Sequence, residues 1–128
     1  MVAVILGNGK NNSSFSAISY SLKKEELGKG QLMKMKNFPS ILGSNSKDFE
    51  LRNYLIRKTS ILPNKKPIKN PQLHVVISSG GFKNTKEELT NVAEKWLKEM
   101  GYGEQPYVIV NHTDSDNNHV HIITSRVD

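Results

Sequence analysis

The chain contains no cysteine. This excludes a disulfide scaffold, a zinc–thiolate site and a cysteine nucleophile, so any metal must be held by histidines, carboxylates or water. No apolar run approaches the ~20 residues that a membrane-spanning helix needs. The opening "MVAVIL" has no basic leader and no cleavage site, so we interpret it as a buried strand and not as a signal peptide. We therefore expect a cytoplasmic protein without a membrane segment.

Length, composition and charge indicate one globular domain with a basic surface. The chain has 128 residues, of which 36% are hydrophobic and 23% charged, and its formal net charge is +6. Such a chain can bury a real core. The lysines and arginines concentrate between residues 22 and 70. A surface of this kind attracts polyanions, of which nucleic acid is the commonest in a cell, although a merely soluble lysine-rich surface has the same composition.

The pattern of apolar and turn-forming residues predicts an α+β fold, in which helices pack on one face of a central antiparallel sheet. The clearest helix spans residues 84–103, where Thr85 and Glu88 form a capping box and Gly101 ends the helix. We interpret residues 31–46 mostly as loop, with room for a short strand, and the proline-rich residues 62–72 as a connector. The other expected elements are strands at 1–6, 73–80, 105–113 and 119–127, helices at 15–27 and 47–59, and a turn at 114–118.

Three of the four histidines lie in the last 18 residues, "NHTDSDNNHVHIITSRVD". Residues two apart on a strand point to the same face, so His119 and His121 project together, while Val120 and Ile122 project to the other face. The turn folds His112 back toward this pair from the neighbouring strand. Three neutral imidazoles converging in this way favour a divalent cation site with open coordination positions on the central strands. The alternative is three separate hydrogen-bonding histidines.

The remaining polar residues near these histidines have competing interpretations. Asp114 is a candidate for a carboxylate that orients an imidazole, whereas Asp116 fits a turn former better. A cupin-like oxygenase also uses a His-x-His pair, but it needs a glutamate soon afterwards on the same strand, and "HVHIITSRVD" has none. His74 opens an apolar strand alone, and we interpret it as a packing or hydrogen-bonding residue outside the ligand set.

The spacing H-x-D-x4-H-x-H in "HTDSDNNHVH" resembles the third motif of relaxases, the plasmid-nicking members of the His-hydrophobic-His endonucleases. The segment "FSAISYSLKKEELGKGQLM" is similar to the N-terminal tyrosine motif of Bacteroides-type mobilisation proteins. "LHVVISS" resembles the strand before the family's central helix, and the chain from residue 94 onward resembles the helix, strand and hairpin that end at the metal site. The resemblance covers nearly the whole chain, and the histidine motif is more specific than the tyrosine motif.

This resemblance implies a relaxase that nicks one DNA strand at an origin of transfer. Tyr20 matches the nucleophile, and His112, His119 and His121 match the ligands of a magnesium, manganese or zinc ion. Asp114 matches the acidic position of the histidine motif. The implied partners are single-stranded DNA and accessory mobilisation proteins, in the bacterial cytoplasm. Such relaxases usually continue further, so we expect residues 1–128 to be the N-terminal part of a longer protein.

Tyr20 is flanked by Lys23 and Lys24, whose charges favour a phenolate and hold a phosphate. Without the resemblance, a half-buried helix tyrosine would be the simpler interpretation of Tyr20. Tyr54 has the position of a core residue on an amphipathic helix. Tyr102 and Tyr107 flank the last hairpin and fit packing roles.

Two other function classes remain open at this level. A replication initiator or transposase nuclease shares the chemistry, but many initiators place the histidine motif before the tyrosine, whereas here Tyr20 precedes it. The second alternative is a non-catalytic basic DNA-binding accessory protein, in which the histidines are structural.

Overall fold

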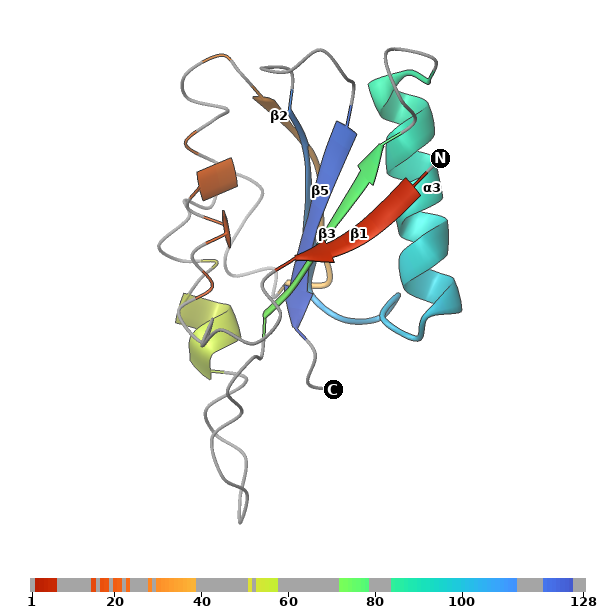
Figure 1. Ribbon diagram of the computed structural model, residues 1–128. Coiled ribbons are helices and arrows are strands. Elements are labelled where there is room, and N and C mark those ends of the chain that lie inside the picture. Colours follow the sequence, from red (N-terminus) through yellow and green to blue (C-terminus); the bar gives the residue numbers. More distant parts are fainter. Residues whose placement is uncertain are drawn as a thin grey trace.

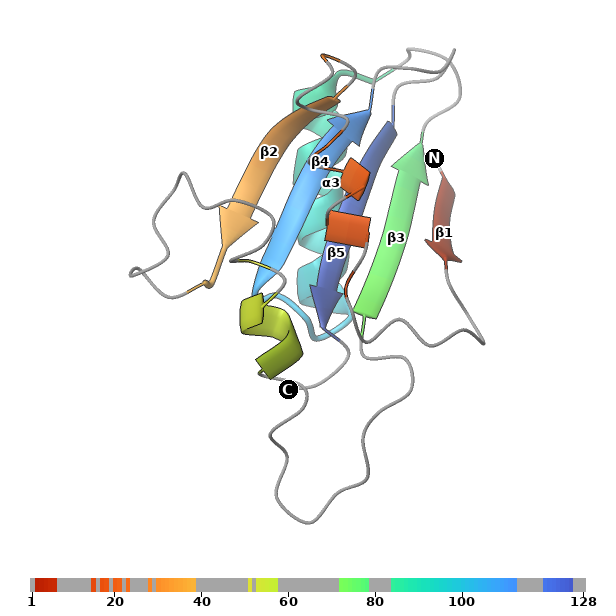
Figure 2. The same cartoon turned by 90° about the vertical axis from the view of Figure 1, so that its left-hand side faces the viewer.

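The centre of the molecule is a five-stranded antiparallel sheet in the order β1-β3-β5-β4-β2. Figure 1 shows the sheet beside α3, and Figure 2 shows the order of its strands. Every neighbouring pair of strands is antiparallel. The strands are β1 (Val2–Leu6), β2 (Gly30–Lys36), β3 (Gln72–Ser78), β4 (Tyr107–His112) and β5 (His119–Ser125). The structure, a computed structural model, describes residues 2–6, 15, 17, 18, 20, 21, 23, 28, 30–38, 51, 53–57, 72–78, 84–112 and 119–125.

The middle of the sheet is buried on both faces. All six residues of β4 are buried, and so are all residues of β5 except the half-buried His119. The β-branched residues that dominate "YVIVNH" and "HVHIITS" suit such a position, because they pack well against neighbours on a pleated surface. The expected hairpin of these two strands is confirmed, with His112 opposite His119 and Val110 opposite His121.

The one complete helix that the structure describes is α3 (Lys86–Glu99). The predicted capping box is present: the Glu88 amide donates to Thr85 Oγ1 over 3.1 Å, and the Thr85 amide donates to Glu88 Oε1 over 3.0 Å. Gly101 follows with φ 89°, in the left-handed region that favours glycine. The Tyr102 amide then donates to the Leu97 carbonyl over 2.7 Å, which closes a Schellman motif.

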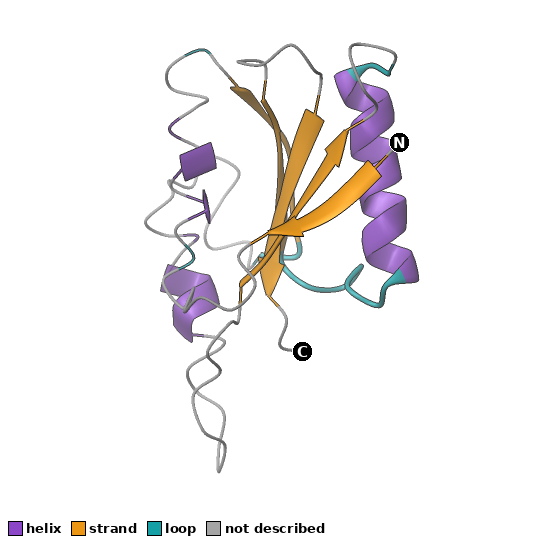
Figure 3. Cartoon of the chain, in the orientation of Figure 1, coloured by secondary structure: helices purple, strands orange, loops and turns teal. Residues whose placement is uncertain are grey.

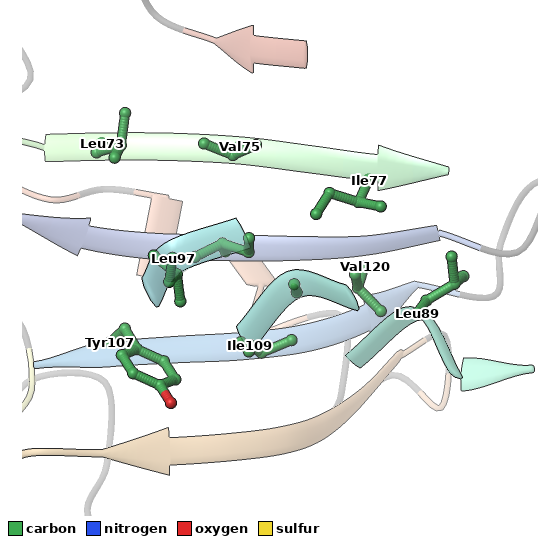
Figure 4. Close-up of a cluster of buried hydrophobic side chains, with 10 residues drawn as sticks. Leu73, Val75, Ile77, Leu89, Leu97, Tyr107, Ile109 and Val120 are labelled. Carbon is green, nitrogen blue, oxygen red and sulfur yellow. The ribbon is translucent and has the colours of Figure 1, made fainter. Parts of the chain in front are cut away.

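Two hydrophobic clusters pack on opposite faces of the sheet. The first joins α3 to alternate residues of β3, β4 and β5 (Figure 4). Its buried members are Leu73, Val75, Ile77, Leu89, Ala93, Leu97, Tyr107, Ile109, Val120 and Ile122. The second cluster uses the intervening strand residues, and its buried members are Phe15, Ala17, Ile18, Leu51, Leu55, Val108, Val110 and Ile123. Both faces of the sheet are therefore covered.

The helical residues of the second cluster lie on the side away from α3 (Figures 2 and 3). The described helical positions are 17, 18, 20, 21, 23, 51 and 53–57, within the two segments expected to be helical. The α+β class with helices packed on an antiparallel sheet is thus confirmed, but the expectation that they share one face is wrong. The physical reason is that β4 and β5 carry apolar residues at consecutive positions, so both of their faces need cover.

Strand β2 lies where the sequence predicted mostly loop with at most a short strand. Its register against β4 shifts between Leu32 and Lys34. As a result, Met33 packs on the α3 cluster while Leu32 and Met35 pack on the other cluster. The bulge breaks the simple period-two alternation of the strand, which obscures its signal in the sequence. The two lysines also suit an edge strand, since charge discourages pairing with other chains.

Candidate active site

The antiparallel hairpin brings three histidines to one place on the face opposite α3. His112 follows Val108 and Val110 at period two, and His119 and His121 precede Ile123 in the same way, so all three share the face of the second hydrophobic cluster. The ring centroids of His112 and His121 are 3.8 Å apart in a stacked arrangement. Those of His112 and His119 are 5.5 Å apart, and those of His119 and His121 are 5.2 Å apart. The predicted convergence of the three imidazoles is present.

These three side chains, which we call the histidine triad, have a geometry that fits a metal ion. One ligand nitrogen from each lies within 4.8 Å of the other two. When three nitrogens are no further apart than this, a point exists that is about 2.8 Å or less from each of them. Movements of roughly 0.7 Å by the nitrogens toward that point would give the usual metal–imidazole distance of about 2.0–2.1 Å. His112 and His121 are buried, whereas His119 is half-buried. The donor set, three imidazole nitrogens, suits a catalytic metal that keeps an open position.

His74 is the residue that the sequence analysis left outside this site. It lies on β3, next to β5, and its Nε2 is 2.7 Å from Nδ1 of His121. The centroids of the two rings are 4.9 Å apart. Burial lowers the pKa of the His74 imidazole to about 4, so this side chain is neutral near pH 7. The interpretation as a hydrogen-bonding residue fits the contact, but its partner is a member of the triad. The sequence could not show this, because only the strand order places β3 beside β5.

Tyr20 belongs to the helical residues that cover the triad's face of the sheet. Its ring meets His112 edge-on, with 5.9 Å between centroids and 62° between planes. The side chain is 54% exposed. A tyrosine that touches a triad histidine and still reaches solvent is open to a substrate. The structure therefore brings together the tyrosine and the histidines that the sequence analysis selected.

The other tyrosines are engaged in packing. Tyr107 lies in the α3 cluster, on the opposite face of the sheet from the triad, and its hydroxyl donates to Glu94 Oε2 over 2.6 Å. Tyr102 also packs against that cluster. Tyr54 is half-buried against the second cluster, with its ring 5.6 Å from that of Phe38. These positions agree with the packing roles predicted for all three.

Some of the predicted site residues have only a partial structural description. Lys23 is an exposed helical residue three positions after Tyr20. Lys24, Asp114 and Asp116 lie outside the described residues. The roles expected for these three therefore stay predictions.

Comparison with protein families gives a match that spans most of the chain. The family model described as "Relaxase: MobA/VirD2-like, nuclease domain" matches residues 20–128. The chain belongs to this relaxase family. The family predicted from the tyrosine and histidine motifs is thereby confirmed, and the matched region contains Tyr20 and the whole histidine triad. No curated protein and no solved structure matches this relaxase domain significantly. Among the helices described in it, none is long and apolar enough to cross a membrane.

Proposed function

We propose that this relaxase domain cuts one strand of DNA at an origin of transfer by metal-assisted transesterification, with Tyr20 as the nucleophile. The observation that carries the proposal is the edge contact of the Tyr20 ring with His112. This contact joins a solvent-accessible phenol to a histidine triad of metal-binding geometry. A nucleophile and a Lewis-acid site side by side are the two components that phosphodiester transfer needs.

The histidine triad would hold a divalent cation such as magnesium, manganese or zinc. A cation held there would supply Lewis-acid chemistry: it would polarise the non-bridging oxygens of the phosphodiester and offset the charge that develops at phosphorus. Neutral imidazoles do not reduce the charge of the ion, which suits an anionic substrate. The burial of His112 and His121 directs substrate to the side of His119 and Tyr20, the two partly exposed members of the site.

In the cleavage step, the Tyr20 hydroxyl oxygen attacks phosphorus and the bond from phosphorus to the 3′ oxygen breaks. The phenolic proton is lost, and the departing 3′ oxygen takes up a proton. The products are a 5′-phosphotyrosine and a 3′-hydroxyl, and no oxidant or water is consumed. Because a phenolate is also a good leaving group, the reverse reaction rejoins the strand. This reversibility suits the transfer of a plasmid or mobilisable element.

The substrate that we propose is single-stranded DNA in the bacterial cytoplasm, prepared by accessory mobilisation proteins. Its support is the net charge of +6 and the lysine-rich stretch from residue 22 to 70. Within that stretch, Lys23 is an exposed helical residue three positions after Tyr20. A cation at this place favours a bound phosphate close to the nucleophile. We expect Lys24 and Asp114 to take part as well, the first in binding DNA and the second in orienting a histidine.

The test is the covalent adduct. The wild-type domain, loaded with manganese, is incubated with a 5′-labelled and a 3′-labelled single-stranded oligonucleotide from the transfer origin of its own element. We expect the protein to become attached to the new 5′ end of the product. Tyr20→Phe keeps the ring and its packing but removes the attacking oxygen, so the adduct should disappear while DNA binding and thermal stability change little.

Two matched variants control for the loss of a tyrosine hydroxyl elsewhere. Tyr54→Phe and Tyr102→Phe should form the adduct at wild-type levels. An undiminished adduct in Tyr20→Phe, or label mapped to another tyrosine, refutes the assignment of the nucleophile. Cleavage without any adduct shows a hydrolytic nuclease that uses a metal-activated water. DNA binding without cleavage by a metal-loaded wild-type protein supports the accessory-protein alternative.

A further inference from the structure

We infer that His74 is a positioning residue for the histidine triad: it accepts a hydrogen bond from Nδ1–H of His121 and so holds the tautomer of His121 whose Nε2 can bind a cation. This inference rests on the proposed function, because it assigns His74 a purpose only if the triad binds a metal.

Both residues of this contact lie on paired strands of the sheet. His74 and His121 lie on neighbouring central strands, β3 and β5, with Val76 directly opposite His121. His74 is thus diagonal to His121 on the same face, within reach of a long or aromatic side chain. Its Nε2 is 2.7 Å from Nδ1 of His121. His74 is not part of the group of three whose ligand nitrogens lie within 4.8 Å of one another. His74 therefore contacts the triad through His121 and is not one of its three candidate ligands.

The position of one proton decides what this contact does. In a hydrogen bond between two neutral imidazoles, one ring donates and the other accepts. If His74 donated, Nδ1 of His121 would carry the lone pair and its Nε2 would carry the proton, so no nitrogen of His121 would be open to a cation. If His121 donates, its Nε2 has a lone pair for the metal. Metal binding by His121 is compatible only with the second arrangement.

The surroundings of His121 add a second constraint. Its ring is stacked on that of His112, with 3.8 Å between centroids and 28° between planes. It is also buried, at 7% exposure. The stack limits the ring plane, and the hydrogen bond to His74 limits rotation within that plane. Most metal-bound histidines have a carboxylate, a carbonyl or water in the place that His74 takes here. A neutral imidazole at this place can orient the His121 ring as a carboxylate would, without adding a negative charge near a phosphodiester.

The test combines a tautomer measurement with metal affinity. The ¹⁵N spectrum of the metal-free wild-type protein at pH 8 should show His121 protonated at Nδ1 and not at Nε2. Zinc alone is then titrated calorimetrically into the wild type, His74→Gln and His74→Leu. Gln has an amide oxygen that can accept in place of Nε2, so its affinity should stay within about threefold of wild type. Leu has no acceptor, and we expect affinity to fall about 10- to 100-fold, with the His121 proton redistributed toward Nε2.

The possible results distinguish failure of the role inferred for His74 from failure of the proposed metal site. His121 found unprotonated at Nδ1 in the wild type overturns the inference without any variant, so a poorly folded His74→Leu does not block the test. Wild-type zinc affinity in a folded His74→Leu also overturns it. A loss in His74→Gln as large as that in His119→Ala would make His74 a ligand. Equal zinc binding by wild type and His119→Ala refutes the proposed metal site, whereas the tautomer of His121 still reports the hydrogen bond.

Discussion

Metal binding at the histidine triad should stabilise the folded domain by an amount that can be worked out. The three histidines of the proposed site lie on β4 and β5, so they come together only when the hairpin is formed. A ligand that binds only the folded state at 100 times its Kd adds about 2.7 kcal/mol to the free energy of unfolding. For 128 residues, the entropy of unfolding is roughly 0.27 kcal/mol/K. The midpoint Tm should therefore rise by about 10 °C, and each further tenfold in cation should add about 5 °C.

Titration calorimetry first gives the Kd for manganese. Scanning calorimetry then measures the Tm of the metal-free protein and of the protein with manganese at about 1, 10, 100 and 1,000 times that Kd. In His119→Ala and in the double variant His119→Ala/His121→Ala, manganese should not raise the Tm above that of the same variant without metal. The matched control is Asn91→Ala, an exposed residue of α3 on the other face of the sheet, which should rise like the wild type. An equal rise in the double variant would place the ion elsewhere. No rise in the wild type at 100 times Kd would refute binding to the folded hairpin.

Three further predictions concern the helix cap, the buried tyrosine and DNA. Thr85→Ala removes the side-chain acceptor of the capping box and should lower stability by about 1 kcal/mol, or roughly 4 °C in Tm, whereas Thr85→Ser should not. Tyr107→Phe loses the hydrogen bond to Glu94 and should cost about 1.5–3 kcal/mol in urea unfolding at pH 7. Burial, together with the hydrogen bond to Glu94 and its charge, raises the pKa of Tyr107 above its ordinary value. The folded state therefore keeps the proton when the unfolded state begins to lose it, so wild-type stability should decline as pH rises above about 10 and the difference from Tyr107→Phe should narrow. A difference that stays constant to pH 11 would contradict this. Finally, the logarithm of affinity for single-stranded DNA should fall steeply and linearly with the logarithm of salt concentration, and a flat response would argue against phosphate contacts.

Local features of the site and of α3 could be predicted from the sequence because they depend on short-range geometry. The period of two along a strand places His119 and His121 on one face, and a short turn returns the chain to His112. In the same way, Thr85, Glu88 and Gly101 determine where α3 begins and ends, since a cap involves only neighbouring backbone groups. Composition predicted a basic single domain. The resemblance of the histidine and tyrosine motifs predicted the relaxase family, which the family match over residues 20–128 confirms.

Only the tertiary structure decided which distant segments meet. The order β1-β3-β5-β4-β2 places His74 against His121, 47 residues away. The helical residues that cover the second sheet face bring Tyr20 into contact with His112, which lies 92 positions later in the chain. Strand β2 pairs with β4 although its bulge hides its period. These contacts depend on which strands pair and on which helical residues cover each face of the sheet. A local sequence pattern does not determine this, because the apolar residues of both sheet faces must be buried at the same time by segments that are far apart in the sequence.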